Sequence, residues 1–276
     1  GIVAHSPLVN TIVAASAGAV MCVLYGTLLT PTIAKFAVFS IIWNAFTLDV
    51  GGASFYFYTD TAAMYPEGPH FSEYFYNTAM GVAESLCSLF GIYLYQVYMR
   101  NWRYRTLLVG VYSIYASLGI LDVIMFARLN VRMGIPDHIF VFGMDIFRET
   151  VAQWTWMPQV VILSYLCPKG MEATMYAMIA GAHNIGSVIS ASIGALMLHR
   201  LGIQPRGDHG ESAQFENLWV ASAIASAAPL VACLLLYRLI PDGAQQEQLV
   251  GCNECTTGSL WRRWTGRDKP GSDGDS

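Results

Sequence analysis

The chain has 276 residues, of which 54% are hydrophobic and only 12% are charged, and its mean hydropathy is +0.43. Soluble domains average about 25% charged residues, so this composition excludes an ordinary soluble domain and indicates a protein that crosses a membrane several times. The formal net charge is −4 and the sequence shows no basic stripe, so we expect no nucleic-acid partner.

Seven apolar stretches are long enough to cross a bilayer, which requires about 20 helical residues. In chain order, they predict helices over Leu8–Leu29, Ile33–Tyr58, Tyr74–Tyr98, Thr106–Ala127, His138–Leu166, Glu172–Leu198 and Leu218–Leu239. The connections are short and contain proline and glycine, as in PEGP at 66–69 and CPKG at 167–170. This pattern predicts an all-α membrane protein with about seven transmembrane helices in a polytopic domain over residues 1–240.

The second, third and fourth stretches each carry an acidic residue at membrane depth. Asp49 precedes the pair Gly51-Gly52, where a helix can loosen and offer backbone groups to a ligand. The glycine pair fits close helix contact equally well, so both interpretations stay open. Glu84 is a second candidate, whereas Asp122 has no visible partner in its own stretch and ranks below the others.

The fifth stretch carries a polar group of four residues. Asp145, Arg148, Glu149 and Gln153 are spaced to share one broad helix face. A charge at the centre of a membrane helix costs roughly 2.5–3.5 kcal/mol, so this face should avoid lipid. Arg148 forms a structural ion pair with Asp145 or Glu149, or the group is a substrate or proton site. Trp154 follows and could stack a flat heterocycle, although lipid or core contact also fits it.

The sixth stretch carries small residues at every fourth position, namely Ala182, Gly186, Ser190 and Gly194. Such a ridge lets another helix approach closely, so we interpret it as a packing surface. Asn184 lies beside the ridge and is a further candidate for substrate binding or proton coupling.

After Pro241 the composition predicts a disordered tail over residues 241–276. The distribution of Lys and Arg among the connections places this tail in the cytoplasm. Cys252 and Cys255 do not supply the four ligands of a structural zinc site, so we predict neither a metal nor another cofactor. The segment WRRW at 261–264 fits either lipid headgroups or a solvated tail.

Several short motifs occur in a fixed order along the chain. They are FYFYTD at 55–60, PEGP at 66–69, FGMD at 142–145, LCPKGMEATMYA at 166–177 and NIGS at 184–187. Over roughly residues 31–240, their order and spacing resemble the folate-biopterin transporter family of the major facilitator superfamily. The LCPKGMEA turn is the most specific of them, because in that family such a turn joins the tenth and eleventh helices.

The resemblance implies a membrane transporter of folates and pterins, a proton symporter in several members, with a path between two six-helix halves. It equates the chain with the sixth to twelfth helices, so we expect a fragment that lacks the first half and needs that half or another membrane chain. Asp145 or Glu149 would bind the aminopyrimidinone edge of a pterin, and Arg148 would bind the glutamate tail of a folate.

Three other classes compete with this interpretation. A non-transporting membrane assembly protein, or a degenerate transporter copy, stays possible because a lone half has no closed path. A seven-helix receptor is a further alternative, but its photoreceptor version is excluded, since the last stretch lacks a lysine for a Schiff base. An enzyme is not expected, because no paired catalytic aspartates, metal triad or Ser/His pair lies at membrane depth.

Overall fold

The computed structural model describes residues 6–166, 172–239 and 258–265, which form helices and connecting turns without a β-strand in these ranges. Among the described residues, five short elements accompany the long helices: two π-helices, denoted η, and three single-turn α-helices. The elements are α1 Pro7–Leu28, α2 Pro31–Phe46, α3 Gly51–Thr59, η1 Tyr74–Ala79, α4 Met80–Leu94, η2 Tyr95–Met99, α5 Tyr104–Phe126, α6 Leu129–Arg132, α7 Asp137–Leu166, α8 Glu172–Arg200, α9 Ser212–Phe215, α10 Leu218–Leu239 and α11 Leu260–Trp264.

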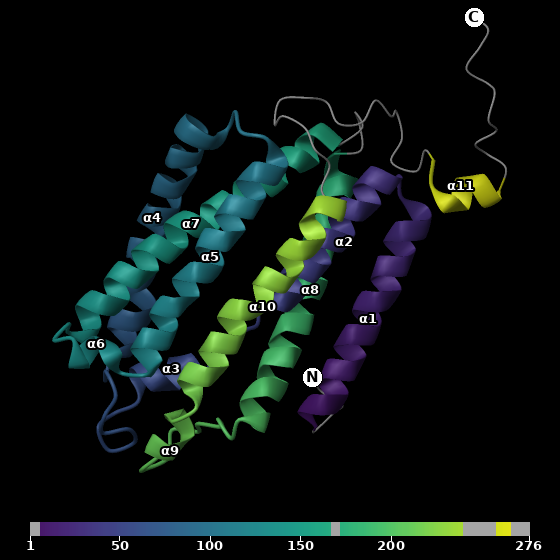
Figure 1. Ribbon diagram of the computed structural model, residues 1–276. Helices are drawn as coiled ribbons and strands as arrows, with labels where there is room; N and C mark the ends of the chain where they lie inside the picture. The colour runs from purple at the N-terminus through teal and green to yellow at the C-terminus, as the bar shows by residue number, and fades with distance from the viewer. Residues whose placement is uncertain (1–5, 167–171, 240–257, 266–276) are drawn as a thin grey trace, which may run out of the picture.

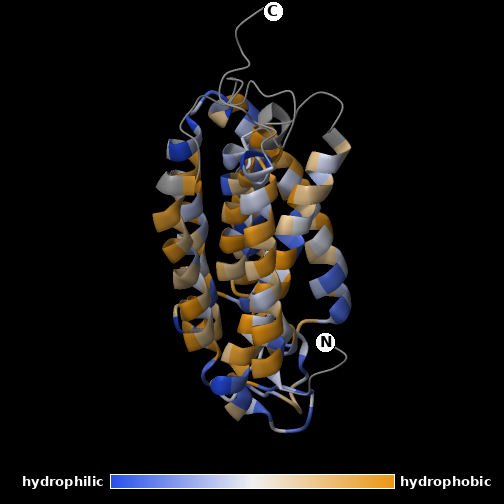
Figure 2. Cartoon of the chain, turned by 90° about the vertical axis from the view of Figure 1, so that its right-hand side faces the viewer, coloured by the Kyte–Doolittle hydropathy of each residue, from blue (hydrophilic) through white to orange (hydrophobic). Residues whose placement is uncertain are grey.

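The protein is an integral, multi-pass membrane protein. Six of the predicted stretches give helices that are long and apolar enough to cross a membrane. The remaining predicted stretch gives α7, which has the required length with 30 residues, but its charged and amide side chains lower its hydropathy. Hydrophilic residues gather toward the two ends of the bundle and hydrophobic ones between them (Figure 2). The predicted all-α membrane fold is therefore confirmed.

The long helices form two groups with α10 between them (Figure 1). In one group α4 and α5 pack against α7, and in the other α1 and α2 pack against α8. Helix α10 contacts α5 of the first group and α2 of the second. Where α2 and α5 begin, a core cluster joins both groups, and within it Trp43 stacks on Tyr112 with ring centroids 3.7 Å apart. This arrangement leaves room for a site beside α10.

The first helix is held by contacts with distant residues of α8. Thr11 donates its hydroxyl proton to the carbonyl of Ser192 at 2.9 Å, and Tyr25 donates to the carbonyl of Met178 at 3.1 Å. Much of the remaining surface of α1 is apolar and exposed. Such a surface suits contact with lipid or with another apolar helix.

The second predicted stretch is broken at the point where Asp49 and the glycine pair occur. Helix α2 ends at Phe46 and α3 begins at Gly51, so residues 47–50 leave the helical path. Of the two interpretations of the glycine pair, the structure therefore shows the discontinuous helix.

The small-residue ridge of α8 packs against this break. Ser190 donates a hydrogen bond to the carbonyl of Thr47. A Cβ atom on Gly194 would lie 1.9 Å from the carbonyl oxygen of Asp49, and one on Gly186 would lie 2.8 Å from that of Ile41. Only glycine permits these approaches, so the prediction of a packing ridge is confirmed.

Part of the stretch predicted as a disordered tail has a defined structure. Residues 258–265 include α11, which contacts α1, and the Ser259 side chain accepts a hydrogen bond from the Arg262 backbone at 3.2 Å. For these eight residues the structure departs from the sequence expectation. Cys252, Cys255 and the turn at 167–170 lie outside the described residues.

Candidate functional site

A cavity of about 670 Å³ is bordered by α4, α5, α7, α10 and the α2–α3 break. Ligand pockets for small molecules usually measure roughly 300–1,000 Å³. The lining combines charged, aromatic and small residues, although the surrounding bundle is apolar. A polar cavity inside an apolar membrane bundle is the expected place for a transported solute.

The cavity gathers charged residues from separate parts of the chain. Four carboxylic acids and one arginine are among its lining residues, and they are Asp49, Glu84, Asp122, Asp145 and Arg148. Four of them are site residues predicted from the sequence, and Asp122 is the addition. Their roles in binding stay predictions, but the fold brings them into one space.

Arg148 is held by an acid from another helix. Its guanidinium donates a hydrogen bond to the carboxylate of Asp122, so an ion pair joins α7 to α5. The two side chains are 33% and 17% exposed, respectively. Of the alternatives for Arg148, the structure shows an ion pair, but with Asp122 in place of Asp145 or Glu149, because spacing along one helix does not show what a neighbouring helix supplies.

Glu84 and Asp145 border the cavity from α4 and α7. Neither carboxylate forms a hydrogen bond or an ion pair with another of the residues that the structure describes. Partly buried polar groups normally find hydrogen-bond partners. These two acids are therefore the ones best able to accept hydrogen bonds from a ligand or to carry a proton.

Asp49 has a local structural role as well as a place on the cavity. Its Oδ1 atom accepts a hydrogen bond from the backbone of Gly51 at 2.7 Å, in the first turn of α3. A negative charge is favourable at a helix N-terminus, where backbone N–H groups lack partners. The carboxylate thus helps α3 to begin anew after the break while it faces the cavity.

Four residues predicted for the site do not line this cavity. Gln153 donates a hydrogen bond to Glu149 at 2.8 Å, one turn apart on α7. The indole of Trp154 donates to the carbonyl of Gly91 at 3.1 Å and so fastens α7 to α4. Asn184 is exposed on α8. Of the alternatives for Trp154, the structure shows a contact between helices.

Aromatic residues of the cavity were missed by the sequence reasoning. Tyr58, Tyr76 and Tyr115 line it, and the rings of Tyr58 and Tyr76 are stacked with centroids 5.4 Å apart. A spacing signal was present, since Tyr76 lies eight residues before Glu84 and Tyr115 seven before Asp122. Such spacings place each tyrosine on the same helix face as an acid.

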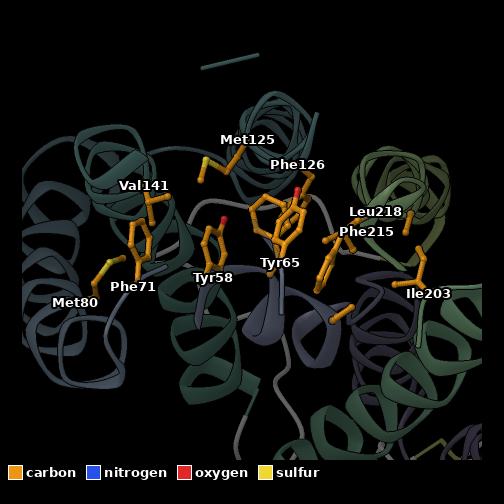
Figure 3. Packing of buried hydrophobic residues seen from close by; sticks show 13 residues of the cluster. Tyr58, Tyr65, Phe71, Met80, Met125, Phe126, Val141, Ile203, Phe215 and Leu218 are labelled. Atoms are coloured by element: carbon orange, nitrogen blue, oxygen red, sulfur yellow. The ribbon is translucent and has the colours of Figure 1, made fainter. Parts of the chain in front are cut away.

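One end of the cavity borders an aromatic core cluster. Tyr58, Met80 and Phe126 belong to both the cavity lining and this cluster. Figure 3 shows Tyr58, Tyr65 and Phe126 close together in the cluster, which lies at the end of the bundle that holds α3 and α9. Buried aromatic rings pack densely, so this side of the cavity rests on a well-packed core.

The connections at the same end are fastened by polar contacts. Arg128 forms a two-pronged ion pair with Asp137, with distances of 2.8 and 2.9 Å, which ties the end of α5 to the start of α7. The backbone of Glu211 donates to the carbonyl of Met64 at 2.8 Å. Nearby, burial and then the charge of Glu211 raise the pKa of the Asp60 carboxyl, which His70 partly opposes.

The chain is similar to known proteins over most of its length. The BT1 family matches residues 6–257. Over 220 residues the chain is 30% identical to "Probable folate-biopterin transporter 6" of Arabidopsis thaliana, which covers 80% of this chain and 41% of that protein. It is also 30% identical over 220 residues to the "Folate-biopterin transporter" of Synechocystis sp., covering 80% of this chain and 40% of the relative.

A more distant relative is "Folate transporter 1" of Plasmodium falciparum, 26% identical over 177 residues, which is 64% of this chain and 34% of the relative. The chain thus spans about two fifths of the length of the first two relatives. No solved structure matches the chain.

Proposed function

Because this chain belongs to the BT1 family, we propose that it forms one wall of the substrate path of a membrane carrier for folates and pterins. The observation that carries the proposal is the cavity with five charged side chains inside an apolar bundle. The names of the relatives supply the substrate class. A binding cavity bordered by charges at membrane depth fits transport better than catalysis.

In this proposal the free carboxylates of Glu84 and Asp145 accept hydrogen bonds from the ring of the substrate. The aminopyrimidinone edge of a pterin offers adjacent N–H groups, which a carboxylate can bind through two parallel hydrogen bonds. Tyr76 and Tyr115 supply aromatic faces against which the flat ring can pack. The same two acids are our candidates for carrying the coupled proton.

A carrier of this kind needs a second half to close its path. We propose that the cavity faces further helices, supplied by the part of the relatives that this chain does not span or by another membrane chain. The positive-inside rule supports a cytoplasmic C-terminus, because Arg100, Arg103 and Arg105 lie at the end of the bundle from which α11 also extends.

The alternative is a membrane protein that only assembles with partners. In the sequence, the small-residue ridge of α8 was the feature that favoured it. Within the described chain, Gly186, Ser190 and Gly194 already contact α2 and the α2–α3 break, so this part of the ridge is occupied. The observation therefore favours transport over assembly.

Uptake of labelled biopterin and folate tests the proposal in transport-deficient cells that express the chain together with an N-terminal half from a relative. Asp145→Asn should abolish uptake with surface expression unchanged, because the cavity loses an acceptor. Glu149→Gln is the matched control on the same helix, since Glu149 lies outside the cavity lining and contacts Gln153. Normal uptake by Asp145→Asn would contradict the assignment, and uptake absent in every combination would favour the assembly protein.

A further inference from the structure

The charges that line the cavity are unbalanced. Among the described lining residues Arg148 is the one base, whereas Asp49, Glu84, Asp122 and Asp145 are acids. The sequence reasoning assigned Arg148 to the glutamate tail of a folate. That assignment requires the guanidinium to be available to a ligand.

The guanidinium of Arg148 is already engaged. Asp122 accepts its hydrogen bond and balances its charge across the α5–α7 contact. A ligand carboxylate that bound the other N–H groups of Arg148 would place its charge beside that of Asp122, so that two acids would share one base. Arg148 is therefore a poor receptor for the tail as long as Asp122 holds it.

The two ends of a folate would interact in different ways with the cavity wall formed by α4, α5 and α7. The pterin ring is uncharged and offers N–H donors, which suit the free carboxylates of Glu84 and Asp145. The glutamate tail carries two carboxylates, and placing it beside these acids in their ionised form brings like charges together, which is unfavourable. The same wall that favours the ring thus opposes the tail.

We propose that this wall selects the uncharged pterin ring and rejects the anionic glutamate tail, and that Asp122 sets this preference by occupying Arg148. The inference rests on the proposed function and deepens it. In a complete carrier the tail of a folate would have to lie away from this wall. Asp122 acts through Arg148, so it is a positioning residue that sets the specificity.

Three probes separate the two ends of the substrate in binding assays on the full chain, assembled in lipid nanodiscs with the N-terminal half used in the uptake test. They are biopterin, which has the ring alone, folic acid, which has ring and tail, and p-aminobenzoylglutamate, which has the tail alone. We expect biopterin to bind about tenfold more tightly than folic acid, and the tail alone to show no binding.

Asp122→Asn should release Arg148, so the affinity for folic acid relative to biopterin should rise about tenfold. Asp137→Asn is the matched control, because it removes an aspartate that pairs with an arginine outside the cavity, and it should leave the ratio unchanged. Asp122→Glu keeps the charge and should keep the wild-type preference. If Asp122→Asn does not fold, Arg148→Gln tests the same point, because the ratio should not change.

Several outcomes would overturn the inference. One is wild-type binding of p-aminobenzoylglutamate that Arg148→Gln abolishes, since Arg148 would then receive the tail. Another is an equal or higher wild-type affinity for folic acid than for biopterin. If the folded chain together with the N-terminal half binds none of the three probes, the proposed function fails as well, whereas tail binding through Arg148 contradicts this inference alone.

Discussion

Two regions of the protein show opposite kinds of packing. One is the contact of α8 with the α2–α3 break, and the other is the cavity wall formed by α4, α5 and α7. At the break, glycine lets backbone approach backbone, and a single added carbon atom has no room. At the cavity wall, charged side chains border an open space and are held by one ion pair across helices. The first region depends on small residues spaced regularly along one helix, and the second on which helices become neighbours.

The largest effect is expected where the backbones are closest. Gly194→Ala should lower the free energy of unfolding by about 3 kcal/mol, because its Cβ would overlap the carbonyl of Asp49 and push the break away. Thermal unfolding in detergent measures the change. Gly181→Ala is the control on the same helix, since its Cβ would lie 3.6 Å from the hydroxyl of Tyr25. Equal midpoints for the two variants would show that the contact is not tight.

The cavity wall should respond more to charge than to size. Asp122→Asn should cost about 2 kcal/mol of stability, because Arg148 keeps its charge and loses its partner in a partly exposed site. The double variant Asp122→Asn/Arg148→Gln should recover most of this loss, since no unpaired charge remains. Unfolding midpoints of the three variants test the coupling, and additive losses would argue against the ion pair.

The hydrogen bond at the break should contribute less than the close contact itself. Ser190→Ala should lower stability by about 1 kcal/mol, because the carbonyl of Thr47 loses its donor. Ser187→Ala is the control, since the hydroxyl of Ser187 bonds within α8 to the carbonyl of His183. If both variants unfold at the same temperature, the contact between the helices does not depend on this bond.

The smallest effect is expected outside both regions, at Asp60. Its folded pKa is raised, so the proton is held more tightly in the folded state than in the unfolded chain, where the carboxyl titrates near about 3.9. The resulting stabilisation is present below that unfolded value and is lost as the pH rises through the folded pKa. Asp60→Asn should remove this dependence and raise the midpoint at pH 7.

Unfolding measured from pH 4 to 7 tests this prediction, with Glu67→Gln as a control in the same loop. A wild-type midpoint that falls less than that of Asp60→Asn over this range would contradict the sign. Neither variant should change the stability effects of the substitutions at the break or at the cavity wall.

The sequence supports prediction of the first region better than of the second. Hydrophobic length located the helices, and the four-residue spacing of Gly186, Ser190 and Gly194 predicted their close packing. The partner of Arg148 could not be predicted, because Asp122 lies 26 residues away on a helix whose position depends on the whole bundle. For the same reason Trp154 looked like a ligand contact, whereas its acceptor belongs to α4.

The contact between α1 and α8 has a consequence for how the protein is made. Thr11 lies 181 residues before its acceptor Ser192, so α1 is synthesised and enters the membrane long before α8 exists. Until α8 is inserted, the side of α1 that later contacts α8 must tolerate lipid or another partner. The sequence of α1 allows this, because its hydropathy is 1.9 and it contains no charged residue from Pro7 to Leu28. The apolar surface of α1 is therefore suitable both before α8 is inserted and in the complete bundle.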